Sequence, residues 1–69
     1  MQQTISERFL RLRDVMQRVS LSRTTIYRLI GEGGRFPAPV KLGERASAWT
    51  ESSITEWINQ RIASSEKVA

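Results

Sequence analysis

Four side chains suited to contacting a polyanion lie close together in one short stretch of the chain. At ~100° per helical residue, Arg23, Thr24, Tyr27 and Arg28 fall on a single face, where no acidic residue lies among them. Arginine can donate two hydrogen bonds to guanine, threonine can contact a phosphate or the thymine methyl, and tyrosine can stack or bond a phosphate. We therefore predict that this face, the recognition face, contacts duplex DNA. An ordinary solvated helix surface remains the alternative.

The helix that carries this face has a clear start and end. Ser22 is a suitable N-cap, because its hydroxyl can accept a hydrogen bond from a free amide of the first turn. Leu21 and Ile26 occupy the two positions of a hydrophobic staple, and the glycines of 31–34 end the helix. Since free N–H groups at a helix start suit phosphate, Ser22 and Thr25 are also candidate DNA contacts.

A second short helix is predicted just before, over 12–19, after a short strand or extended entry within 9–12. Its apolar residues recur at spacings of three and four, which places them on one face: Leu12, Val15, Met16 and Val19. Two short helices joined by a tight turn are typical of a helix-turn-helix, whose second helix enters the major groove while the first supports it. Arg11 and Arg13 are candidate phosphate contacts from this first helix, as is Arg18; a plain surface role is equally open.

A short hairpin follows the rigid connection over 36–39. Its strands are predicted at 40–42 and 47–49, with Val40 and Leu42 pointing inward and Lys41 outward. With Lys41 on its outer face and Arg45 at its tip, the hairpin can act as a wing on the DNA backbone or minor groove. The alternative is that the hairpin only covers the core; the two roles are compatible.

The last predicted helix begins after Thr50, with Trp49 and Ile54 at its staple positions. Its buried stripe is expected to comprise Ile54, Trp57, Ile58 and Ile62. The positions of Trp49 and Trp57 favour core packing over stacking on single-stranded bases. The fold class is thus mainly α with a small β-hairpin. A single domain is expected over 8–63, between a flexible N-terminus at 1–7 and a flexible tail at 64–69.

Composition supports a DNA partner and argues against catalysis. The chain has 69 residues and a net charge of +4, and nine of its eleven basic residues lie between Arg8 and Arg45. A basic centre suits a polyanion, although a generic basic surface would look the same. The chain contains no cysteine and no histidine, so we expect no enzyme, cofactor or metal site. Without a signal peptide or membrane-length apolar run, we expect a cytoplasmic, nucleoid-associated protein.

At the level of motifs, the chain resembles the AlpA family of prophage regulatory proteins over about residues 8–62. The matching segments are Phe9-Leu10-Arg11-Leu12-Arg13-Asp14-Val15, Leu21-Ser22-Arg23-Thr24-Thr25-Ile26-Tyr27-Arg28-Leu29-Ile30, Phe36-Pro37-Ala38-Pro39-Val40-Lys41-Leu42-Gly43, Arg45, Trp49 and Ile54 through Trp57. The resemblance implies a winged helix-turn-helix similar to MerR-type and excisionase domains, with the recognition helix at 22–30 and the wing at 40–49. It also implies transcriptional regulation in a prophage or other mobile element.

Two positions depart from the family pattern. Ser20 stands where the turn commonly has glycine, so the turn can carry strain. Ser53 stands where relatives often have an acid that completes a capping box with Thr50. The chain is also too short for the coiled coil and effector domain of MerR regulators, so no small-molecule effector is expected.

Three functions remain open from the sequence. The leading interpretation is a sequence-specific transcriptional regulator. The same fold also serves excisionase-type factors, which bend attachment-site DNA for a recombinase, and a protein-interaction module without DNA binding is the alternative of another class. Expected partners are double-stranded DNA, further copies of the chain on repeated half-sites, and an integrase or RNA polymerase; no membrane partner is expected.

Overall fold

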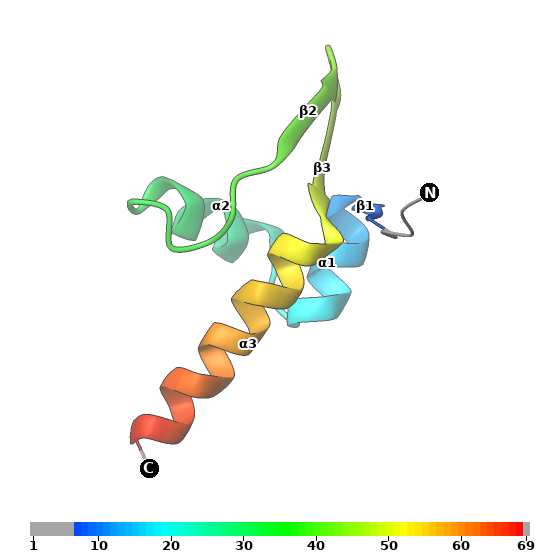
Figure 1. Cartoon of the computed structure of the whole chain (residues 1–69). Helices are drawn as coiled ribbons and strands as arrows, with labels where there is room; N and C mark the ends of the chain where they lie inside the picture. Colours follow the sequence, from blue (N-terminus) through cyan, green and yellow to red (C-terminus); the bar gives the residue numbers. More distant parts are fainter. Residues whose placement is uncertain (1–6, 69) are drawn as a thin grey trace, which may run out of the picture.

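The computed structural model describes residues 7–68 and contains three helices and a three-stranded antiparallel sheet within that range (Figure 1). The elements follow the chain in this order: β1 (Phe9–Leu10), α1 (Leu12–Val19), α2 (Arg23–Gly31), β2 (Val40–Gly43), β3 (Ala46–Thr50) and α3 (Glu51–Val68). The β2–β3 hairpin and the C-terminal half of α3 project from the body in different directions (Figure 1). This order confirms the predicted mainly α fold with a small hairpin.

Helices α1 and α2 are joined by a turn that depends on one left-handed residue. Ser20 has φ 57° and ψ 38°, and its N–H donates to the Met16 carbonyl (2.9 Å), which closes the end of α1. The next helix starts as predicted, because the Ser22 hydroxyl accepts the Thr25 N–H at 3.2 Å. The strain expected at Ser20 therefore has a structural basis, since serine tolerates this backbone region less well than glycine.

The sheet has the strand order β1-β3-β2, with β3 in the centre. Strand β1 pairs with the end of β3, placing Leu10 opposite Trp49, and β2 pairs with its beginning, placing Lys41 opposite Ser47. A register irregularity lies between Lys41 and Gly43. Strand β3 thus connects the N-terminal segment, the hairpin and the start of α3.

The start of α3 is capped by residues from two parts of the chain. The Thr50 hydroxyl accepts the Ser53 N–H at 3.3 Å, while the Ser53 hydroxyl donates to the Thr50 carbonyl at 2.9 Å. The Glu7 carboxylate accepts hydrogen bonds from the Ser52 N–H (3.2 Å) and hydroxyl (2.9 Å). Glu7 thus brings a carboxylate from outside the helix to the first turn of α3, where its charge suits the helix dipole; it bonds Ser52 and does not replace the capping-box bond to Thr50.

Glu7 and the end of α3 correct the predicted domain limits. Glu7 was assigned to the flexible N-terminus, but it is bonded to Ser52; the rest of that segment, 1–6, lies outside the described residues. A flexible tail was expected at 64–69, and within the described residues this segment belongs to α3, which continues to Val68. No proline or glycine follows Ala63, so the sequence lacks a strong signal to stop the helix there.

The core forms where the three helices meet the sheet. Its buried side chains come from β1, the three helices, β3 and the loop before β2: Leu10, Val15, Ile26, Phe36, Trp49 and Ile54. The staple residue Leu21 packs against this core, and Trp57 is partly buried beside Phe36, with ring centroids 4.8 Å apart. The two tryptophans thus serve the core, as the sequence predicted. No helix in residues 7–68 has the length and apolar character needed to cross a membrane.

Three residues predicted to be buried are exposed. Val40 and Leu42 are 43% and 44% exposed, and Ile62 is 52% exposed. Strand alternation alone predicts that one face of β2 is buried. The hairpin projects from the body (Figure 1), and both faces of β2 are exposed. Ile62 lies one turn beyond Ile58, where α3 has already left the core.

Replacing Ser20 with glycine should stabilise the protein. Glycine adopts the left-handed conformation without the penalty that a Cβ imposes, and we expect Ser20→Gly to raise the free energy of unfolding by about 0.5–1 kcal/mol. Urea denaturation followed by circular dichroism would measure the change. Ser64→Gly, on the exposed part of α3, is the matched control and should be destabilising; an equal loss in both variants would contradict the assignment of strain to Ser20.

Candidate nucleic-acid interface

A groove on the surface brings together basic side chains from three separate elements. Its lining, which we call the basic groove, comprises Arg11, Leu12, Arg13, Asp14, Arg23, Tyr27, Arg45 and Ser47. The start of α1, the recognition face of α2 and the hairpin therefore border one hollow. Four guanidinium groups and one carboxylate give it a positive charge, and arginine forks match the geometry of phosphate oxygens and of guanine.

Tyr27 is held in this groove by the core of the sheet. Its ring meets the ring of Trp49 edge-on, with centroids 6.4 Å apart and an interplanar angle of 61°. Trp49 is itself 1% exposed, and its indole N–H donates to the Pro37 carbonyl at 2.7 Å. Because edge-on aromatic pairs contribute beyond their buried area, this contact helps to hold α2 beside β3.

The hairpin directs its basic residues toward the groove. Arg45, in the turn between β2 and β3, and Ser47, on β3, both line it. Lys41 is the cross-strand partner of Ser47, so its side chain leaves the same face of the hairpin. Val40 is paired with Ala48 and belongs to the opposite face. The predicted outward direction of Lys41 thus places it beside the groove.

The other predicted contact residues lie around the groove rather than in it. Thr24 and Arg28 are exposed on α2 but do not line the hollow. Ser22 and Thr25 are engaged with each other, since the Ser22 hydroxyl accepts the Thr25 N–H and donates to the Thr25 hydroxyl at 3.1 Å. Their side chains are therefore committed to starting α2.

Two polar groove residues, Ser47 and Asp14, were not among the predicted contacts. Ser47 could have been found from the alternation of β3, because it lies two residues from Arg45 on the same face. Asp14 lies in the first turn of α1, where a carboxylate suits the helix dipole. It is the one acid in a lining that otherwise carries four arginines.

Arg18, a candidate phosphate contact from the sequence, forms an ion pair within the fold. Its Nη2 donates to Glu51 Oε2 at 2.6 Å, which joins the end of α1 to the start of α3. The Arg18 hydrogen bond lowers the pKa of Glu51, with further contributions from the charges of Arg18 and Arg8. Residues 7–68 contain no group of three or more candidate metal-ligating side chains.

Helices α1 and α2 with their tight turn, a small antiparallel sheet, and a hairpin standing beside the second helix define a winged helix-turn-helix. The chain belongs to the AlpA family: the model described as "Prophage CP4-57 regulatory protein (AlpA)" matches residues 8–62.

Two curated proteins are similar to the chain. The uncharacterized protein ORF88 of Enterobacteria phage P4 is 51% identical over 57 residues, which cover 83% of this chain and 64% of the phage protein. The DNA-binding transcriptional activator AlpA of Escherichia coli (strain K12) is 36% identical over 59 residues, covering 78% of this chain and 84% of that protein. The chain thus spans less than two thirds of the phage relative. No solved structure matches it.

The ion pair between Arg18 and Glu51 should make stability depend on pH. Because the pKa of Glu51 is lowered in the folded state, its contribution is present above the pKa of an unfolded glutamate, about 4.3, and is lost as pH falls through the folded value. Urea denaturation at several pH values should show wild type exceeding Glu51→Gln at neutral pH, with the difference shrinking in acid. Glu56→Gln removes the same charge elsewhere on α3; if it behaved identically, the pair would not be the cause.

Proposed function

We propose that this chain is a sequence-specific DNA-binding regulator of transcription in a prophage or another mobile element. In this proposal α2 enters the major groove, and the β2–β3 hairpin acts as a wing on the flanking backbone or minor groove. The observation that carries the proposal is the basic groove, in which arginines of α1, α2 and the hairpin meet beside the exposed face of α2. The description of the E. coli relative as a DNA-binding activator supports it.

We assign the proposed contacts to two tasks. Arg23 and Tyr27 lie on α2, the element that fits the major groove, so they are the candidates for base contacts together with Thr24 and Arg28. The arginines of the α1 start and of the hairpin tip, Arg11, Arg13 and Arg45, flank that helix and suit phosphates on either side. Base contacts supply specificity, whereas phosphate contacts fix orientation and add affinity.

One copy of a module this small buries only about 600–1,000 Å² on DNA. We therefore propose that specific binding uses two or more copies on repeated half-sites, or one copy with a protein partner such as an integrase or RNA polymerase. Selection of bound sequences from random duplex DNA, followed by footprinting, tests the proposal and counts the half-sites. A protein that enriched no sequence would lack the proposed specificity.

Genome-wide binding separates regulation from recombination. A regulator should occupy promoter regions, whereas an architectural factor for excision should occupy only the attachment site of its element. Binding confined to attachment sites would contradict the regulatory proposal while leaving DNA binding intact.

Substitutions in the basic groove should weaken DNA binding much more than the removal of one positive charge elsewhere on the surface. We expect Arg23→Ala to cost about 1–3 kcal/mol on the selected duplex and to relax the sequence preference, while Arg45→Ala should weaken binding similarly for all sequences. Fluorescence anisotropy with selected and scrambled duplexes measures both effects. Arg61→Ala, a residue of α3 that does not line the groove, is the control; an equal loss there would mean that only overall charge matters.

A further inference from the structure

We propose that Arg35 contacts a DNA phosphate beside the recognition face, and that Glu32 competes with DNA for Arg35 and Arg28 and so restrains sequence-independent binding. This inference rests on the proposed function and adds Arg35 and Glu32 to it. Neither lies in the basic groove. The inference concerns the C-terminal end of α2, where the helix passes into the loop that leads to β2.

The three side chains form one charged cluster on the surface. Glu32 Oε2 lies 3.8 Å from Arg28 Nε, and Glu32 Oε1 lies 3.7 Å from Arg35 Nη1. Each carboxylate oxygen thus faces a different guanidinium, and all three side chains are exposed. Because Arg28 lies on the recognition face, the cluster extends that face by one arginine from the loop.

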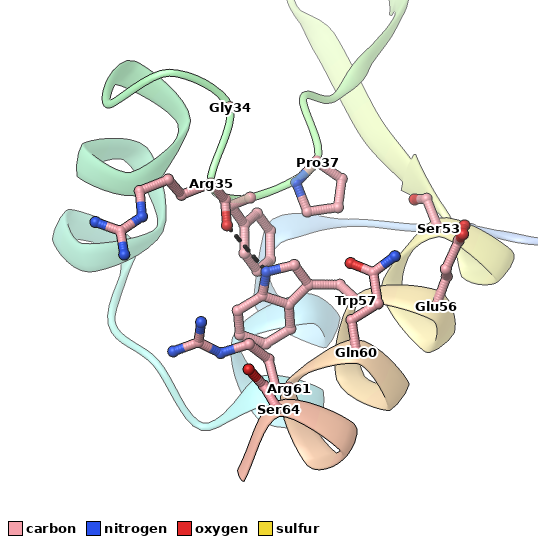
Figure 2. A pocket seen from close by; sticks show the side chains of 10 residues that line it. Gly34, Arg35, Pro37, Ser53, Glu56, Trp57, Gln60, Arg61 and Ser64 are labelled. Atoms are coloured by element: carbon pink, nitrogen blue, oxygen red, sulfur yellow. Dashed lines mark hydrogen bonds between the residues drawn. The ribbon is translucent and has the colours of Figure 1, made fainter. Parts of the chain in front are cut away.

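The fold holds Arg35 at this place rather than leaving it on a free loop. Its N–H donates to the Leu29 carbonyl at 3.1 Å, and its carbonyl accepts the Trp57 indole N–H at 3.0 Å. The chain can turn back sharply because Gly33 and Gly34 adopt φ values of 82° and 77°, which favour glycine. Figure 2 shows this bond to Trp57 and the Arg35 side chain extending away from the indole.

Stability of α2 does not explain Glu32. An acid at the C-terminal end of a helix interacts unfavourably with the helix dipole, whereas arginines there are favourable. Glu32 is the C-cap residue of α2, so its negative charge interacts unfavourably with the helix dipole. Pairing with Arg28 and Arg35 offsets only part of this cost. A role outside the helix accounts for an acid set between two arginines.

The proposed role follows from the weakness of exposed ion pairs. Such pairs contribute little and are screened by salt, so a phosphate can displace Glu32 from either arginine. While Glu32 is present, each phosphate contact must break an ion pair and bring a phosphate close to the carboxylate, which repels it. Both effects reduce the free energy of binding that the contact contributes. The sequence-independent part of binding is therefore reduced.

Affinity for a random-sequence 20-base-pair duplex, measured across a salt series, tests this inference. Glu32→Gln should bind several-fold more tightly than wild type. Arg35→Gln should weaken binding and lower the slope of log affinity against log salt by about 0.9, the value expected for one phosphate contact. In the Arg35→Gln background, the gain from Glu32→Gln should shrink, since one of its two competing partners is gone.

Matched controls carry the same charge changes near the end of α3, away from the hollow that Arg35 lines: Glu66→Gln for Glu32→Gln, and Lys67→Gln for Arg35→Gln. Circular dichroism confirms that each variant is folded. If the paired variants change affinity and slope equally, net charge explains the effects and the inference is overturned, although the proposed function stands. If wild type fails to bind any duplex at low salt, the proposed function itself fails.

Discussion

The packing of Trp49 determines where the hairpin stands relative to the recognition helix. Its backbone pairs with β1 at Leu10, its indole N–H holds the loop at Pro37, and its ring meets Tyr27 of α2. Segments from the N-terminus, the middle loop and the second helix therefore meet at one buried side chain. Because a chain of 69 residues has only a small core, one side chain shared by these segments is a substantial part of what holds them together.

The basic groove is a consequence of this arrangement. Its arginines come from separate short elements, and their like charges repel one another at close range. The apolar contacts beneath them, together with the caps and the Arg18–Glu51 pair between α1 and α3, hold the elements in place. The stabilising contacts are thus largely separate from the groove, which leaves its guanidinium groups available to a polyanion.

Much of this fold could be predicted because its local signals agree. The three-and-four spacing of apolar residues gave α1, and the caps with their hydrophobic staples gave the starts of α2 and α3. The errors in predicted burial share one cause. Val40, Leu42 and Ile62 follow the pattern of buried residues, but they lie on parts that project from the body. Periodicity indicates which residues share a face, and it does not indicate whether another element covers that face.

By itself the sequence determined the elements and the recognition face, since helix periodicity, capping and the charge pattern are properties of neighbouring residues. Only the tertiary structure decided which arginines act together. It placed Arg11 and Arg45 beside Arg23, turned Arg18 toward Glu51, and joined Glu7 to the start of α3. It also brought Arg35 back to the end of α2. These partners are separated along the chain and meet only because the core and the turns bring their backbones together, which no local pattern encodes.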